Sequence, residues 1–179
     1  MNNRCLGLRY HGLTLVELLT VVAVLSVLLA TALPSFSSML YASRLRGVAD
    51  VLIADLRHAL SESKKLGSDV LVTFNLDADG SNWCYGSSVA TDCDCRSTGS
   101  CLIDGAERVT NGNNSPGILA DPSHSSYWFK PRRSTATAGN ILFTAQDGKQ
   151  LKIVISGYGR IRACSPSGNS NLGGYPVCP

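Results

Sequence analysis

The stretch Gly12-Leu13-Thr14-Leu15-Val16-Glu17 opens a long apolar segment of this 179-residue chain. No charged residue occurs in Leu18–Ser43, a run long enough to cross a bilayer, which takes about 20 apolar residues. A carboxylate such as Glu17 at the edge of this segment is costly unless it has a partner or a function. Because Arg4 and Arg9 precede the segment, we expect the amino terminus in the cytoplasm and the rest of the chain outside.

The apolar pattern continues beyond this segment, mostly at the spacings of three and four that mark one face of an amphipathic helix: Phe36, Met39, Leu40, Leu45, Val48, Leu52, Leu56 and Leu60. A competing interpretation is a secretory signal peptide cleaved at Ala30-Thr31-Ala32, which would release a soluble domain. The periodic pattern runs through that site, and Glu17 lies where the apolar core of a signal peptide would begin. We therefore expect one uncleaved helix over residues 13–65.

A short basic leader that ends in glycine, followed by an apolar residue, Thr-Leu, an apolar residue and Glu, resembles the amino terminus of type IV prepilin-like proteins. The resemblance implies that a prepilin peptidase removes residues 1–12 by cutting after Gly12, and that Leu13 becomes a methylated amino terminus. It also implies that the Glu17 carboxylate pairs in the filament with the amino terminus of a neighbouring pilin subunit. A buried carboxylate is tolerated beside such a cation. The mature chain would lie first in the bacterial inner membrane, with its head in the periplasm, and then in the extracellular pilus.

After Gly67 the period of the apolar residues changes from that of a helix to that of strands. The runs "DVLVTFNL" (69–76) and "SNWCYGS" (81–87) flank the turn Asp77-Ala78-Asp79-Gly80 and predict a β-hairpin. Strand-like runs return at 126–130, 140–146 and 151–156, whereas 86–126 is expected to be a long loop with short strands. The order of elements predicts an α+β fold, in which the antiparallel sheet of a head (66–179) packs on the helix.

Seven cysteines are present, and Cys5 lies in the expected leader. An even number outside the cytoplasm indicates disulfides, and the remaining six are Cys84, Cys93, Cys95, Cys101, Cys164 and Cys178. Sequence distance favours a Cys164–Cys178 bridge that closes the tail, with the other four paired among themselves. We expect no metal and no cofactor, because the cysteines lack the paired spacing and nearby histidines of zinc sites. The Asp77-Ala78-Asp79-Gly80 turn likewise lacks the later ligands of a calcium loop.

The net charge of +3 conceals an asymmetry between two segments. Residues 69–121 carry eight acids against two arginines, a net charge of −6, and residues 130–179 carry seven bases against Asp147, a net charge of +6. A basic segment of this kind is suited to binding a polyanion. The alternative is that its bases pair with the acidic segment, which would give the same composition. The seven bases are Lys130, Arg132, Arg133, Lys149, Lys152, Arg160 and Arg162.

The stretch Gly157-Tyr158-Gly159-Arg160-Ile161-Arg162 is the clearest candidate site. Two arginines two residues apart in a strand point to the same side, and the glycines would let a phosphate backbone approach closely. Guanidinium groups hold phosphate oxygens without reading sequence. The chain beyond Cys164 is rich in Gly, Ser, Asn and Pro, and we expect a tethered flexible loop there.

Trp83 and Gly86 in the first hairpin, together with Gly159-Arg160, are similar to the GspH/FimT group of minor pilin subunits. In the FimT-type minor pilins, which the chain resembles most, a Gly-Arg-x-Arg region is associated with DNA capture in natural transformation. The resemblance implies that role for Arg160 and Arg162, and charge alone adds the five other bases. The alternatives are a type II secretion pseudopilin of the GspH kind and a pilus-assembly-priming pilin without a ligand. The sequence shows no catalytic constellation, so we do not expect an enzyme.

Overall fold

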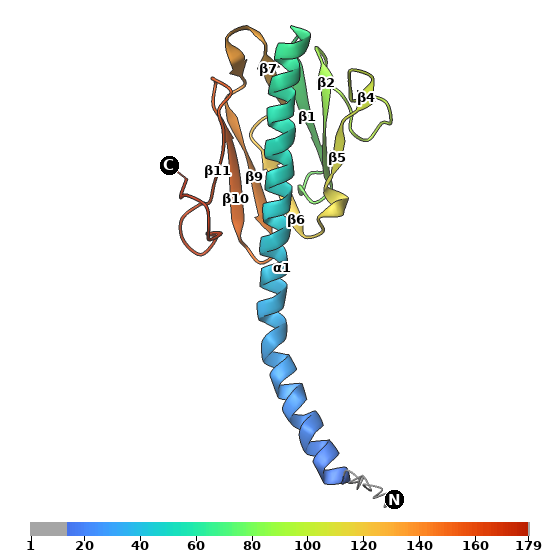
Figure 1. Cartoon of the computed structure of the whole chain (residues 1–179), viewed down its shortest axis with the longest axis vertical. Coiled ribbons are helices and arrows are strands. Elements are labelled where there is room, and N and C mark those ends of the chain that lie inside the picture. Colours follow the sequence, from blue (N-terminus) through green and yellow to red (C-terminus); the bar gives the residue numbers. More distant parts are fainter. Residues whose placement is uncertain (1–13, 179) are drawn as a thin grey trace, which may run out of the picture. The chain divides into compact units, whose positions relative to one another are not determined.

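The computed structural model describes residues 14–178, except the side chains of 31–35, so the predicted cleavage site at Gly12 and Leu13 lies outside the described residues (Figure 1). The chain divides into two compact units, Met1–Ser38 and Met39–Pro179, which we describe separately. One helix, α1 (Leu15–Leu66), begins in the first unit and ends in the second. It is uninterrupted at residues 30–32, as the apolar pattern predicts.

In the first unit, α1 begins directly after Thr14, whose hydroxyl accepts a hydrogen bond from the Glu17 N–H (3.2 Å). This contact satisfies one of the free amide groups at the helix start. The apolar side chains that follow are exposed from Leu15 to Leu29, and Glu17 is exposed as well. Over the described residues, no helix reaches the length and hydropathy that crossing a membrane requires.

In the second unit, α1 buries one face against the sheets. The fully buried positions recur every three or four residues, as the amphipathic pattern predicts: Leu45, Ala49, Leu52, Leu56 and Ala59. Phe36, Met39 and Leu40 were expected on this face but are exposed, since the buried face begins at Ala42. The helix ends at Leu66, and Gly67 follows in the left-handed conformation (φ +66°) typical of helix termini.

The strands form two main antiparallel sheets rather than the single sheet that was expected. One has the order β5-β2-β1-β7-β8, with bounds Val109–Asn111, Trp83–Val89, Val70–Leu76, Ser126–Lys130 and Thr135–Ala136. The other has the order β11-β10-β9-β6, with bounds Ile161–Cys164, Gln150–Ile155, Gly139–Ala145 and Ile118–Pro122. The strands β3 (Leu102–Ile103) and β4 (Ala106–Glu107) pair separately, and short 3-10 helices occupy η1 (Gly112–Asn114) and η2 (Arg132–Ser134).

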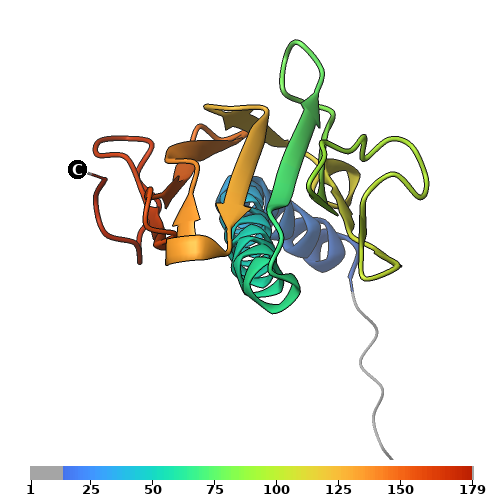
Figure 2. The same ribbon diagram turned by 90° about the horizontal axis from the view of Figure 1, so that it is seen from above.

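Strand β6 explains the division into two sheets. It lies inside the segment expected to be mostly loop, and it pairs with β9 rather than with the strand that follows it in sequence. Its burial alternates, with Ile118 and Ala120 inside and Leu119 and Asp121 outside. Within this unit, strands of both sheets lie along the same side of the helix (Figure 2).

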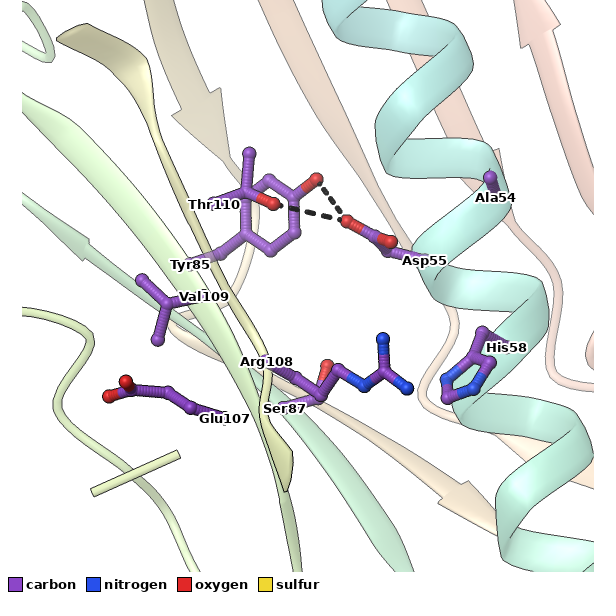
Figure 3. Close-up of a pocket in the computed structure, with 9 residues that line it drawn as sticks. All are labelled: Ala54, Asp55, His58, Tyr85, Ser87, Glu107, Arg108, Val109 and Thr110. Atoms are coloured by element: carbon purple, nitrogen blue, oxygen red, sulfur yellow. Dashed lines mark hydrogen bonds between the residues drawn. The ribbon is translucent and has the colours of Figure 1, made fainter. Parts of the chain in front are cut away.

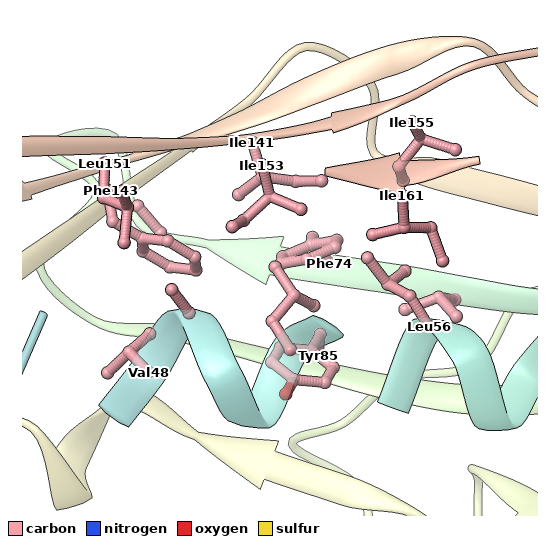
Figure 4. Packing of buried hydrophobic residues seen from close by; sticks show 14 of the residues in the cluster. Val48, Leu56, Phe74, Tyr85, Ile141, Phe143, Leu151, Ile153, Ile155 and Ile161 are labelled. Atoms are coloured by element: carbon pink, nitrogen blue, oxygen red, sulfur yellow. The ribbon is translucent and has the colours of Figure 1, made fainter. Parts of the chain in front are cut away.

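The two sheets and the helix share one apolar core (Figure 4). Val48 and Leu56 of the helix face Phe74 of the first sheet and isoleucines of the second, among them Ile153 and Ile155. Burying a large apolar side chain contributes roughly 1.5–3 kcal/mol. The core therefore joins the carboxyl-terminal half of α1 to the head.

Three disulfides link the six cysteines in the expected grouping. Cys164 pairs with Cys178, while Cys84 pairs with Cys95 and Cys93 with Cys101, at Cα–Cα separations of 5.0, 6.0 and 5.1 Å. A Cβ at Gly86 would overlap the Cys101 sulfur, so the glycine of the first hairpin makes room for a disulfide.

The carboxyl-terminal tail is irregular and tethered, as expected, and it is also hydrogen-bonded to the second sheet. The Gln150 N–H donates to Ser170 O (2.8 Å), and the Ser165 hydroxyl donates to Gln150 O (2.9 Å). Leu172 lies in the core. The many small polar residues prevent regular structure, but these contacts and the Cys164–Cys178 disulfide fix the course of the tail.

Candidate functional site

The two arginines of the Gly-Arg-x-Arg stretch lie at the start of the last strand. Arg160 directly precedes β11, and Arg162 lies within it. Both side chains are exposed and Ile161 between them is buried, so the predicted alternation is confirmed. The two guanidinium groups project from one face of the second sheet.

A tight turn, Ser156–Arg160, connects β10 to β11 and positions Arg160. The Ser156 N–H donates to Arg160 O (2.9 Å), and the Arg160 N–H donates to the Ser156 hydroxyl (3.0 Å). Gly159 has a φ of +71°, and a Cβ there would lie 2.8 Å from Ser134 O and 3.3 Å from Leu60. Only glycine fits, because a side chain would overlap backbone and strain the turn.

This geometry corrects one expectation about the glycines. The space beside Gly159 is filled by Ser134 and Leu60 of the protein itself, so it cannot admit a phosphate backbone. Because Gly159 has no side chain, the turn can pack closely against α1 and the β7–β8 loop. Gly157 remains open, since no atom lies within 4 Å of where its Cβ would be.

A second basic segment lies against this turn. Lys130 ends β7, and Arg132 and Arg133 form η2 before β8; all three are exposed. The Ala136 N–H donates to Gly157 O (3.0 Å), which together with the Gly159 contact joins the two segments. Both lie at the end of the head where α1 ends (Figure 1). We call Lys130, Arg132, Arg133, Arg160 and Arg162 the basic cluster.

Backbone strain accompanies the cluster at η2. Arg133 and Ser134 have φ values of +68° and +53°, in the left-handed region that residues with a side chain rarely adopt. Strain of this kind persists only where the surroundings enforce it. Here the backbone of Ser134 packs closely against Gly159, and this packing helps to hold the left-handed conformation of Ser134.

The two remaining lysines are placed differently. Lys152 pairs with Cys164 across the sheet and Val154 pairs with Arg162, so Lys152 is a diagonal neighbour of Arg162 on the outer face. Lys149 lies in the β9–β10 turn, beyond the opposite end of β10, and its Nζ is 4.0 Å from the Asp147 carboxylate. The length of β10 separates Lys149 from Arg160 by roughly 17 Å at about 3.3 Å per residue. The structure therefore brings Lys152 to the cluster but not Lys149.

Several acids of 69–121 bind groups of their own segment, whereas Asp104 pairs with Lys65 of α1 and Asp92 accepts a hydrogen bond from the Ser126 hydroxyl. Asp77 forms a salt bridge with Arg96 (2.6 Å), and this hydrogen bond lowers the pKa of the Asp77 carboxyl. Asp79 and Asp94 accept hydrogen bonds from backbone N–H groups two residues later, at Ser81 and Arg96. Among the salt bridges of residues 14–178 with described side chains, none joins an acid to the basic cluster.

A polar pocket of about 370 Å³ lies between α1 and the first sheet (Figure 3). The Asp55 carboxylate accepts hydrogen bonds there from the hydroxyls of Tyr85 (2.8 Å) and Thr110 (3.2 Å). Burial raises the pKa of Tyr85 far above its usual range, and the Asp55 charge adds to this effect. Arg108 and His58 face the same space. Sequence reasoning missed Asp55 because its partners are 30 and 55 residues away.

Within the described part of the chain, no group of three or more His, Cys, Asp or Glu side chains could hold a metal ion. The cluster offers exposed guanidinium and ammonium groups, which suit phosphate or carboxylate oxygens.

Comparison with known proteins identifies the family. Residues 48–159 match the family model described as "Type II transport protein GspH", and residues 8–33 match the "Prokaryotic N-terminal methylation motif". The second match includes Gly12, Leu13 and Glu17, and this motif implies processing by prepilin peptidase, membrane anchoring and assembly with other pilins. No curated protein matches the sequence significantly.

Two crystal structures of the type IV minor pilin FimU from Pseudomonas aeruginosa (strain PAO1) are similar to this chain. One has a TM-score of 0.49 and 20% identity, and the match covers 67% of this chain and 87% of that one. The other has a TM-score of 0.46 and 20% identity, with 66% and 91% covered. The GspH match alone spans more than half of the chain, from α1 to the turn before Arg160. The chain therefore belongs to the GspH family of pilin-like proteins, as the resemblance of its sequence implied.

Proposed function

We propose that this protein is a minor type IV pilin that holds DNA for uptake in natural transformation. The observation that carries the proposal is the basic cluster: its arginines are exposed, they belong to two segments whose backbones are in contact, and no acid of the described residues forms a salt bridge with them. The planar guanidinium group of arginine can donate two parallel hydrogen bonds to the oxygens of one phosphate. The cluster is thus suited to the repeating phosphates of a nucleic acid.

The contacts would be to the backbone and carry no sequence information. A footprint of a few phosphates gives weak binding, micromolar or poorer at physiological salt, and the affinity falls steeply as salt rises because counterions are released. Lys152 would extend the contact along the outer face of β10, beside Arg162. Lys149, which was included from charge alone, would contribute little because it lies at the other end of that strand.

A salt titration tests the DNA role. Full-length protein in nonionic detergent is titrated with labelled DNA over a series of salt concentrations, beside the Arg160→Gln/Arg162→Gln variant. We expect the variant to bind several-fold more weakly, with the slope of log K against log salt reduced by roughly two. Lys149→Gln is the matched control and should behave nearly as the wild type. Equal binding by the double variant, or no binding by the wild type at low salt, would contradict the proposal.

The amino-terminal motif supports a second part of the proposal. Prepilin peptidase would cleave between Gly12 and Leu13, Leu13 would be methylated, and the mature helix would anchor the protein in the inner membrane with its head in the periplasm. Intact-mass analysis of membrane-extracted protein checks this, and a mature chain that starts at Leu33 would overturn it. The Glu17 carboxylate would pair with a neighbour's amino terminus during assembly. Normal recovery of Glu17→Val in sheared filaments would exclude that role.

A type II secretion pseudopilin is the second candidate function. The description of the matching family favours it, and the match ends at Gly159, before the two arginines. In either role the protein acts as a structural and binding subunit rather than as an enzyme. Deletion of the gene distinguishes the two: loss of transformation with normal secretion supports the pilin, and the reverse supports the pseudopilin.

A further inference from the structure

Tyr158 is the most exposed of the large hydrophobic side chains of the described residues. It lies within the Ser156–Arg160 turn and is 87% exposed. Tyrosine usually buries most of its ring, since the ring is largely apolar. No aromatic partner or side-chain hydrogen bond of Tyr158 occurs among the described residues. No contact within the described part of the chain explains why this largely apolar ring is exposed to solvent.

The turn fixes the backbone that carries Tyr158. The Gly159 N–H donates to Ser156 O (2.9 Å), and Gly157 O accepts from the Ala136 N–H (3.0 Å). The contact of Gly159 with Ser134 and Leu60 secures the other side. Glycine on each side of Tyr158 adds no side chain that could cover its faces. The backbone on both sides of the ring is thus already ordered, which avoids the backbone ordering cost that a mobile loop would incur on binding.

The charges around the ring are those of the basic cluster. Arg160 is two residues away, and Arg132 and Arg133 lie in the segment against which the turn packs. An open aromatic face within a set of guanidinium groups is the combination that proteins use for unpaired nucleic acid strands, in which bases stack on rings while cations hold the phosphates. A duplex offers no free base face, because its bases are stacked on one another.

We infer that Tyr158 stacks on an unpaired base, so that the basic cluster prefers single-stranded DNA to duplex. This inference rests on the proposed DNA-binding function and adds the class of strand. Tyr175 does not take part: it is partly buried against the core near Asp50 and Arg46, and burial raises the pKa of its hydroxyl. Among the described residues, Tyr158 is the most exposed aromatic side chain.

Three probes of equal length separate stacking from phosphate contact. Full-length protein in nonionic detergent is titrated by fluorescence anisotropy with an oligothymidylate of about 15 bases, a mixed-sequence duplex, and a strand built of abasic sites, which keeps the phosphates and lacks the bases. We expect oligothymidylate to bind about five-fold or more tightly than the abasic strand, the loss typical of removing one stacked base. Tyr158→Ala should abolish this difference, and Tyr158→Phe, which keeps the ring, should preserve it.

The outcomes distinguish the inference from the function on which it rests. If Tyr158→Ala binds oligothymidylate as tightly as the wild type, or if the wild type binds oligothymidylate no better than the abasic strand, stacking is overturned. Salt-dependent binding of all three probes would then leave the phosphate contacts standing. If the wild type binds none of them at low salt, the DNA role itself fails. Tyr158→Trp adds a direct readout, since its fluorescence should be quenched by oligothymidylate and not by the abasic strand.

Discussion

The acidic segment 69–121 and the basic segment 130–179 carry opposite net charges of equal size, yet the fold uses their charges differently. In the acidic segment, Asp77, Asp79 and Asp94 bind a nearby arginine or the backbone of their own turns. In the basic segment, Arg160 and Arg162 lie exposed without an acidic partner among the described residues. The acids hold loops together, and the bases remain available to a partner.

The difference follows from the length of the side chains. An aspartate carboxylate is close enough to its own backbone to accept N–H groups two residues later, so it stabilises turns. An arginine carries its charge well beyond the backbone on a long apolar stem and cannot cap its own turn in this way. Equal and opposite segment charges therefore do not imply that the two segments pair.

The largest expected effect is on the disulfides of the two segments. Removal of Cys93–Cys101 from the acidic segment, or of Cys164–Cys178 from the basic one, should each lower the free energy of unfolding by roughly 2–4 kcal/mol, because each closes a loop in the unfolded chain. Only the second loss should weaken DNA binding, since the freed tail lies beside Arg162. Urea unfolding and DNA titration of the paired Cys→Ser variants provide the measurements. If the two variants bound DNA with equal affinity, the prediction that only the basic segment contributes to DNA binding would be contradicted.

An intermediate effect is expected at two glycines with similar surroundings. Gly80 in the acidic segment and Gly159 in the basic one both have positive φ, and a Cβ would lie 2.6 Å from Ala120 O or 2.8 Å from Ser134 O. Gly→Ala at either position should lower the free energy of unfolding by roughly 1–3 kcal/mol. Gly159→Ala should also weaken DNA binding by displacing Arg160, whereas Gly80→Ala should not.

Gly157→Ala is the control for both glycine variants. The space at its α-carbon is open and its φ is not positive, so the free energy of unfolding should change little. A stability loss at position 157 as large as that at 159 would mean that the close contact with Ser134 is not the cause.

The smallest expected effect is on the pH dependence of stability. Hydrogen bonds lower the pKa of Asp77, Asp79 and Asp94 in the folded protein below the ordinary value of 3.8. Because the folded pKa values are depressed, the stabilisation is complete above the ordinary pKa and is lost as pH falls through the folded values. All three carboxyls are exposed, so the loss should be modest. Urea midpoints measured from neutral to strongly acidic pH should fall less steeply for Asp79→Asn than for the wild type.

The double variant Arg160→Gln/Arg162→Gln is the matching control for this titration. Because those arginines have no acidic partner among the described residues, their replacement should leave the acid dependence of the urea midpoint unchanged. A shallower dependence in that variant would show that the two segments interact after all.

Local patterns determined much of the architecture. The spacing of Leu45, Leu52 and Leu56 marked the buried helix face, and the alternating runs at 126–130, 140–146 and 151–156 correspond to β7, β9 and β10. Six cysteines outside the expected leader predicted disulfides and favoured the Cys164–Cys178 bridge. These features succeed because helix faces, strand alternation and short covalent loops depend on neighbours along the chain.

By itself, then, the sequence determined the long helix, the hairpins, the pilin-like amino terminus and the exposed arginines of the last strand. Tertiary structure alone decided that β6 divides the strands into two sheets, that Asp55 meets Tyr85, and that η2 lies against the Ser156–Arg160 turn. It also decided that Gly159 faces the protein and that Lys149 lies away from the cluster. The physical reason is that such contacts join residues far apart in the chain, so they depend on how the whole core packs and leave no periodic signal.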